Sequence, residues 1–517
     1  MGKELKQRIL CMGGFVIAWG TSGGVRADWK DDIGWRQLAA ELGAAMPTGA
    51  GVAVVQAEAN GGSGLSYMPQ AGSGTFAGLG VYAGKQFVAQ DGASVASGHA
   101  GAVASYFYAN GSGVAPGVTT IHGYSAAAYL FNRLLAVGGP EVFPGRVQNH
   151  SWVGTTGSGP TDLSLIRRYD LMLDRDGRVG VVGLNNGTGG LPAMMGNAYH
   201  GLVVGLRNGG HSRGGSNVDG SGRMKPDLVG EAVYTSYSTP MVSGVATLLM
   251  QGAMNAAVGD GDRPQVIKAL MLAGASKQAL PQWRRLTSAK PYDEVFGAGE
   301  VNVRNAWMTQ AGGKWSASEQ SEVGGRGWDF GGTAGAGQSR RYFFRIEPGR
   351  FGNTFAAALT WHREIDLGAG TASLANLNLR LYAAEGFAVG AVVAESVSGV
   401  DNVEHVFLRH LPPGQYALEV AADVAGVNYG LAWQVVEGLG PQLALRIGTA
   451  GQVFVDVTDV DPWTSYQIQS SPSPTGGWTL GQTFRTGDGT AAYGHTWEDQ
   501  NATGASRFYR LSWTLLR

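Results

Sequence analysis

The chain has 517 residues, which is too long for one hydrophobic core and predicts two or three domains. Its 38 basic and 39 acidic residues nearly balance, and we therefore expect no nucleic-acid partner. The 84 glycines follow no collagen-like period and indicate many turns and a β-rich architecture. The one cysteine, Cys11, excludes an internal disulfide.

Residues 1–27 have the pattern of a secretory signal peptide. A basic start with Lys3, Lys6 and Arg8 is followed by an apolar stretch over 9–19 and a cleavage site after Ala27. The apolar stretch is shorter than the ~20 residues that span a bilayer, and no later segment is long enough either. We therefore expect an exported chain, either secreted or at the periplasm or cell surface, without a membrane span.

The stretch 234–250 predicts a buried helix with a hydroxyl residue at its start. After Thr235 and Ser236, apolar residues recur at helical spacing, and Pro240 is expected in the first turn, where proline is tolerated. A helix N-terminus offers unpaired N–H groups and a partial positive charge, which favour an oxyanion beside the serine. Taken alone, the same pattern fits a Ser/Thr cap on a core helix.

Two earlier segments carry an acid and a histidine. Residues 51–56 form a short β-branched run that predicts a buried parallel strand, with Glu58 two residues beyond it. His99 opens a helix of small residues and stands four residues before Val103 and Ala104.

Two further apolar runs end in polar residues. Residues 179–184 predict a buried strand that ends in Asn185-Asn186-Gly187, although Asn-Gly is also a common turn. Residues 147–153 predict another strand, which ends with Ser151 and Trp152.

Together these segments resemble the subtilisin-like serine proteases (subtilases), in which acid, histidine and serine follow in the same chain order. The resemblance covers roughly residues 33–312 and rests on the ordered set of short segments, since each is weak alone. It implies that residues 28–312 form a peptidase domain with an α/β fold and a doubly wound, mostly parallel sheet. The site is then expected at the carboxyl ends of the strands.

The resemblance also implies a role for each residue. Ser236 is the nucleophile and His99 the general base, while Asn185 donates to the oxyanion, with Asn186 as the alternative. Ser151 and Trp152 match the segment that borders the substrate, although a buried core tryptophan is the simpler interpretation.

The acid departs from the family pattern. Subtilases carry an aspartate at the end of the first strand, and Gln56 stands at the matching position. Glutamine has no negative charge to stabilise an imidazolium. Strand side chains alternate, so Glu58 points to the same side, ~6–7 Å further along. We predict that Glu58 replaces the aspartate. Asp91 is the alternative, and Glu58 could instead be a solvated loop acid in an inactive protein.

The composition changes after residue 312. The glycine-rich stretch 313–337 predicts a linker. Residues 338–437 contain alternating short strands and predict a β-sandwich that resembles the jelly-roll domain after many secreted bacterial protease domains. A small β domain is expected over 441–517. His362, His405 and His410 are scattered along these strands, where we expect them to be solvated.

The sequence thus favours a secreted serine endopeptidase that acts on protein or peptide substrates through an acyl-enzyme. The alternative is a catalytically impaired subtilase-fold pseudoprotease, or an adhesion protein whose β domains contact a surface or glycans. Gln56, and Tyr234 where the family keeps glycine, favour the pseudoprotease. The chemistry requires no cofactor, and no acidic loop indicates a calcium or other metal site.

Overall fold

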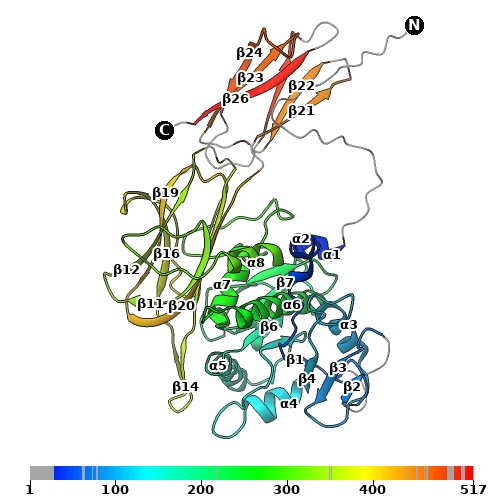
Figure 1. Ribbon diagram of the computed structural model, residues 1–517. Helices are drawn as coiled ribbons and strands as arrows, with labels where there is room; N and C mark the ends of the chain where they lie inside the picture. The colour runs from blue at the N-terminus through cyan, green and yellow to red at the C-terminus, as the bar shows by residue number, and fades with distance from the viewer. Residues whose placement is uncertain are drawn as a thin grey trace, which may run out of the picture.

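The computed structural model describes residues 28–60, 65–72, 74–76, 80–216, 218–348, 350, 352–438, 441–449, 452–458, 460, 464–485, 494–501 and 507–515. The expected signal peptide at 1–27 lies outside the described residues. In the described part, no helix is long and apolar enough to cross a membrane. Figure 1 shows an α/β part in blue to green, a β-rich part in yellow, and a small β part in orange and red.

An eight-stranded sheet forms the centre of the α/β part, in the order β10-β7-β6-β5-β1-β4-β3-β2. Neighbouring strands are parallel, except that β2 pairs antiparallel with β3. Parallel strands are buried on both faces, which explains their runs of β-branched residues. The strands are β1 (Val54–Glu58), β2 (Gly74–Phe76), β3 (Lys85–Ala89), β4 (Thr120–Ser125), β5 (Val147–His150), β6 (Val179–Gly183), β7 (Leu202–Leu206) and β10 (Leu228–Gly230), with a separate hairpin of β8 (Gly214–Ser216) and β9 (Arg223–Lys225).

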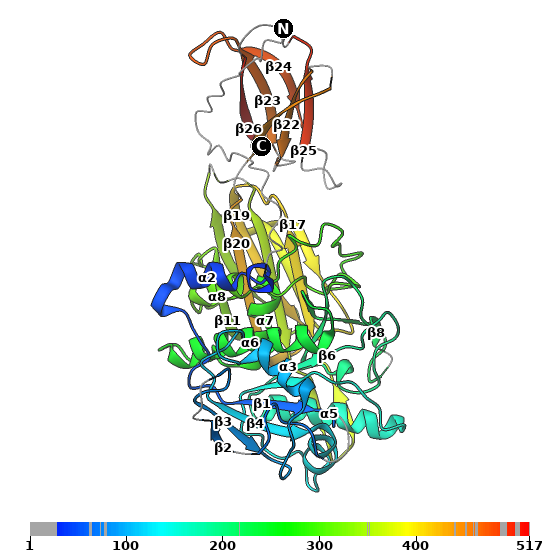
Figure 2. The ribbon, with the colours of Figure 1, turned by 90° about the vertical axis from the view of Figure 1, so that its right-hand side faces the viewer.

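Helices cover both faces of this sheet (Figure 2). On β1, Val54 belongs to one core cluster and Val55 to another, so successive side chains enter different layers. The first layer contains α2 (Trp35–Leu42), α3 (Gly98–Phe107), α6 (Thr235–Asn255), α7 (Pro264–Gly274) and α8 (Val303–Ala311); the second contains α5 (Gly159–Arg175) and η2 (Tyr129–Leu134). Short helices lie at α1 (Trp29–Asp32), η1 (Gly43–Ala45), α4 (Ala126–Ala128) and η3 (Met195–Asn197). The structure therefore has the mixed α/β sheet with a parallel core that the sequence predicted.

The order of the strands places a topological switch point at the end of β1. The chain leaves β1 towards β2 and β3, whereas it leaves the adjacent β5 towards β6 and β7. Adjacent strands whose connections run in opposite directions form a switch point, where open α/β sheets bind ligands at the carboxyl ends of the strands.

The β-rich part consists of two four-stranded antiparallel sheets, β11-β20-β13-β18 and β12-β19-β16-β17. Their facing side chains, including the buried Trp361 and Trp433, form a separate core. The C-terminal part has two three-stranded sheets, β21-β22-β25 and β24-β23-β26. The strands are β11 (Arg326–Ala334), β12 (Ser339–Ile346), β13 (Thr354–Trp361), β14 (Glu364–Asp366), β15 (Thr371–Ser373), β16 (Leu377–Glu385), β17 (Ala388–Ser396), β18 (Val403–Leu408), β19 (Gly414–Ala422), β20 (Ala425–Val436), β21 (Gln442–Ile447), β22 (Val453–Thr458), β23 (Thr464–Ser471), β24 (Thr479–Phe484), β25 (Gly494–Asp499) and β26 (Phe508–Leu515).

The predicted glycine-rich linker at 313–337 is not a linker throughout. Strand β11 lies inside it and pairs with β20 as part of the sandwich. A Cβ atom added to Gly331 would lie 2.5 Å from the Tyr429 ring on β20. The glycine therefore makes room for a tyrosine, and the sandwich begins near residue 326 and not at 338.

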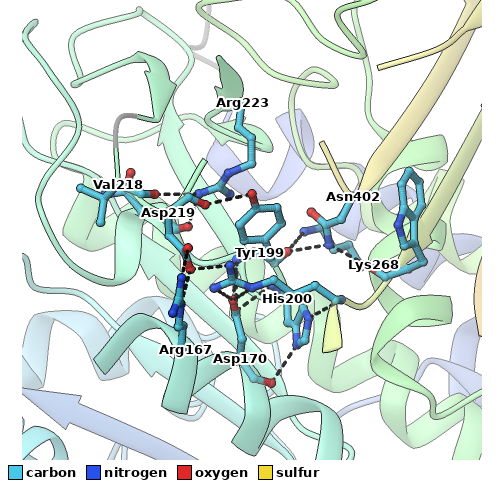
Figure 3. A network of polar contacts seen from close by, with 12 residues as sticks. Arg167, Asp170, Tyr199, His200, Val218, Asp219, Arg223, Lys268 and Asn402 are labelled. Carbon is cyan, nitrogen blue, oxygen red and sulfur yellow. Dashed lines mark hydrogen bonds and ion pairs between the residues drawn. The ribbon is translucent and has the colours of Figure 1, made fainter. Parts of the chain in front are cut away.

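The sandwich docks on the α/β part through a shared core and a buried polar network. Ala358, Val403 and Ala432 of the sandwich belong to the same core cluster as α7. Figure 3 shows the polar network around Tyr199, His200 and Asp170.

Arg363, which follows β13, reaches into this network. Its guanidinium lies 2.8 Å from the Asp170 carboxylate and also pairs with Asp219. The guanidinium groups of Arg363 and Arg223 lie 4.1 Å and 3.6 Å, respectively, from the centroid of the Tyr199 ring. Both Arg363 and Asp170 are excluded from water, so each charge depends on the other.

Of the three histidines that were expected to be solvated, His405 and His410 are buried, and only 7% of the His362 side chain is exposed. The His362 ring stacks on His200 at 3.8 Å and its Nδ1 lies 2.6 Å from Asp174, while His405 packs against Trp283. The expectation was wrong because His362 and His405 contact the α/β part of the chain and not water, and His410 is buried as well.

We expect Arg363→Met to lower the free energy of unfolding by about 3–5 kcal/mol, because it leaves the Asp170 carboxylate buried without its cation. Urea unfolding followed by tryptophan fluorescence measures the change. Arg350→Met is the control: Arg350 pairs with Glu437 where both side chains are about half exposed, and its loss should change stability by about 1 kcal/mol or less. Equal effects of the two substitutions would contradict this account of the docking.

Candidate active site

The carboxyl ends of three adjacent strands place the polar residues of the site side by side. His150 on β5 pairs with Ala57 on β1 and with Val182 on β6. Ser151 therefore continues β5 between Glu58 at the end of β1 and the loop with Asn185 after β6. The sheet thus arranges these groups in a line across the switch point.

Glu58 and His99 form a hydrogen-bonded pair. The Glu58 Oε2 atom lies 2.7 Å from His99 Nδ1. The Glu58 side chain is fully buried, whereas 43% of the His99 side chain is exposed. Ser97 is the N-cap of α3, and its hydroxyl accepts the backbone N–H of Ala100 at 3.2 Å. This cap fixes the first turn of the helix, in which His99 lies. The carboxylate thus holds Nδ1 of the imidazole, and Nε2 has no hydrogen-bond partner among the described residues.

The two groups change each other's protonation. Burial raises the pKa of Glu58, and the hydrogen bonds from His99 and Gln56 oppose that rise. The hydrogen bond to Glu58 raises the pKa of His99, against the smaller opposing effect of burial. A base with a raised pKa accepts a proton more readily, so the pair suits general-base chemistry.

Ser236 lies in the first turn of α6, a long and mostly buried helix. Its hydroxyl donates to the Ser151 carbonyl at 3.2 Å, so it lies beside the strand end next to Glu58. Helix α6 begins at Thr235, and Pro240 therefore lies in its second turn and not in the first as expected. Proline has no N–H, so the Ser236 carbonyl has no helical donor at that position.

Asn185 and Asn186 have different partners. The Asn186 Oδ1 atom accepts the Thr235 N–H at 2.9 Å and its hydroxyl at 3.1 Å, so Asn186 holds the start of α6. The Asn185 backbone is tied to Ser212. In the described part of the chain, the Asn185 side-chain amide and the Ser236 N–H have no hydrogen-bond partner. These two donors are therefore available to a ligand.

The remaining predicted site residues have clear places. Ser151 is buried and contributes its carbonyl, and Trp152 is half-buried against the second helix layer, with its ring 5.8 Å from His150. Asp91, the alternative acid, accepts the Ser125 N–H at 2.8 Å and lies 3.5 Å from Arg133. The structure brings Glu58 to His99, and it gives Asp91 other partners.

Sequence reasoning did not find the partners of Gln56. Its side chain contacts Glu58, Ala100 and Tyr108, all within a buried environment. The available signal was a polar residue inside an apolar strand, on the same face as Glu58. The described residues contain no group of three or more His, Cys, Asp or Glu side chains placed to hold a metal ion.

No family model and no curated protein matches the chain. Among solved structures, it is similar to proteases from Pseudoalteromonas arctica (19% identity, 54% of this chain and 97% of that chain, TM-score 0.32). It is also similar to the patellamide maturation protease PatA (19% identity, 51% of this chain and 98% of that chain, TM-score 0.33). A further similar structure is MycP1 from Mycobacterium smegmatis (17% identity, 58% of this chain and 89% of that chain, TM-score 0.32). At these TM-scores the geometry of the site, and not the likeness, carries the functional argument.

We expect Glu58→Gln to lower the pKa of the His99 imidazole, because the substitution removes the carboxylate that stabilises its charged form. An NMR titration of ring-labelled histidine measures this directly and needs no substrate. Glu404→Gln is the matched control, since Glu404 is also fully buried but bonds Ser396 and Ser398 in the sandwich. A His99 titration that is the same in wild type and Glu58→Gln would show that the pair does not form.

Proposed function

We propose that the protein is an exported serine endopeptidase whose catalytic triad is Ser236, His99 and Glu58. The observation that carries the proposal is the hydrogen bond between the buried Glu58 carboxylate and His99, at the carboxyl ends of the strands where the first turn of α6 holds Ser236. A carboxylate that holds one imidazole nitrogen fixes the tautomer whose other nitrogen can accept a proton.

In this mechanism His99 acts first as a base and then as an acid. The Ser236 hydroxyl gives its proton to His99 Nε2 while its Oγ attacks the carbonyl carbon of the scissile peptide. When the tetrahedral intermediate collapses, the C–N bond breaks and His99 returns the proton to the leaving amine. Water then hydrolyses the acyl-serine by the same steps, and Glu58 stabilises the imidazolium each time.

Two donors are proposed to stabilise the oxyanion. Among the described residues, the Asn185 side-chain amide and the Ser236 N–H have no hydrogen-bond partner, and the positive end of α6 adds to their effect. Asn186 is unsuited to this role because its side chain already holds Thr235.

The proposed substrates are protein or peptide chains, which pass Ser151 and Trp152 on the way to the serine. The chemistry requires neither a cofactor nor a metal. Export, as secretion or delivery to the periplasm or cell surface, is part of the proposal and rests on the pattern of residues 1–27.

Ser236→Ala should abolish both peptide hydrolysis and labelling by a fluorophosphonate probe, because it removes the nucleophile. Turnover should fall by ~10⁶-fold, as when the equivalent group is removed from subtilisin. Ser238→Ala is the matched control: its hydroxyl lies two residues further on α6 and bonds Gly205, away from the site. It should keep the labelling.

The probe also separates the proposal from its alternative. A wild-type protein that is folded but does not react with the fluorophosphonate would be a pseudoprotease or a binding protein. Labelling that persists in Ser236→Ala would place the nucleophile elsewhere.

Asn185→Ala should slow turnover by about 10²–10³-fold with little change in KM, because its contact forms mainly as charge develops on the substrate. Asn186→Ala serves as the comparison, since it removes a helix cap and should instead lower stability by about 1 kcal/mol. Steady-state kinetics and thermal unfolding on both variants give the result. If the turnover loss belongs to Asn186→Ala alone, the assignment of the two residues is reversed.

A further inference from the structure

Gln56 connects the carboxylate of the proposed triad to a buried tyrosine. Its Nε2 atom donates to Glu58 Oε1 at 2.8 Å and to the Ala100 carbonyl at 3.0 Å. Its Oε1 atom accepts the Tyr108 hydroxyl at 2.5 Å. Both hydrogens of the amide are therefore used, and its oxygen is engaged as well.

The contacts fix which way the amide points. If Gln56 were turned by half a rotation, its oxygen would face both Glu58 and the Ala100 carbonyl, and its NH₂ group would face the hydroxyl. Tyr108 closes α3 at the end opposite His99, so this helix contacts β1 through both of its ends. Burial raises the pKa of Tyr108 well above its usual range, and it stays a donor at every pH of interest.

Glu58 needs such a partner because it has no contact with water. Its side chain is fully buried, and its two oxygens have separate partners: Oε2 bonds His99 and Oε1 bonds Gln56. An ionised carboxylate without fixed donors at this place would take up a proton. His99 and Tyr108 are the titratable groups that face it, and neither can donate to Oε1 in this arrangement.

We propose that Gln56 and Tyr108 are positioning residues that keep Glu58 ionised and oriented for His99. The inference rests on the proposed function and explains the glutamine at the place where an acid was expected. Gln56 does not replace the acid. It supplies the hydrogen bond that lets the acid lie two residues further along the strand.

The proposal predicts a shift of the pH profile with a definite sign. In the active form Glu58 is ionised and His99 neutral, and protonation of the pair removes the base. Gln56→Met removes the donor at similar volume and destabilises the ionised form. The midpoint of the acidic limb of kcat/KM should then rise by about one pH unit, since a hydrogen bond to a charged group has about that effect. Glu58→Gln should move the same midpoint downwards.

Tyr108→Phe tests the second half of the arrangement. It removes only the hydroxyl that donates to Gln56 Oε1, so the amide is held less firmly against Glu58, and it should raise the midpoint in the same direction by a smaller amount. Tyr129→Phe is the matched control, because Tyr129 donates to Gln148 at the same distance of 2.5 Å, also fully buried, in the opposite helix layer. It should lower stability similarly and leave the midpoint unchanged.

The experiment is a pH profile of hydrolysis of a peptide substrate, paired with an NMR titration of His99 in the full chain. Raised midpoints in Gln56→Met and Tyr108→Phe, but not in Tyr129→Phe, support the proposal. Unchanged midpoints, or equal shifts in all three variants, overturn it. If Gln56→Met fails to fold, Tyr108→Phe decides. If the wild type hydrolyses nothing, the proposed function fails, and the His99 titration still tests the positioning roles.

Discussion

A carboxylate that is fully buried from solvent lies in the α/β part. Glu58 is fully buried at the end of β1, and a charge in that place is stable only if fixed groups replace the lost hydration. This constraint explains several features together. The strand carries a glutamine where an apolar residue would otherwise pack, α3 begins with a histidine facing the strand, and a tyrosine closes the same helix over the glutamine. The stability of the ionised acid and the geometry of the proposed base thus have the same origin.

The period of a β-strand makes this arrangement compatible with a parallel sheet. Side chains two residues apart point to the same face, so an acid can lie at 56 or at 58 without a change in which layer it enters. The position at 58 lies further along the strand and closer to its end. Glutamate adds one methylene relative to aspartate, and the hydrogen bond of 2.7 Å to His99 shows that this reach suffices. The position at 56 then becomes free for the residue that holds the acid.

The elements that could be predicted are those whose pattern is local. Runs such as 179–184 predict buried parallel strands because both faces of such a sheet are covered, and the polar residues at their ends meet at one edge. The pairing of Gln56 with Tyr108 could not be predicted, because the two residues are 52 positions apart and neither has a local signal for the other. The strand at Arg326–Ala334 was missed for a different reason: glycine is common both in flexible linkers and where a bulky ring packs against a strand.

The sandwich could likewise be recognised as a β domain but not as part of the same core. Alternation of apolar and polar residues identifies the two faces of a strand, yet it cannot tell solvent from another domain of the chain. His405 on β18 and Arg363 just after β13 have polar side chains and are nevertheless buried. Because Ala358 and Ala432 pack with α7, and Arg363 neutralises Asp170, separating the two parts would expose apolar surface and leave a buried carboxylate without its cation. The sandwich therefore completes one face of the core of the α/β part.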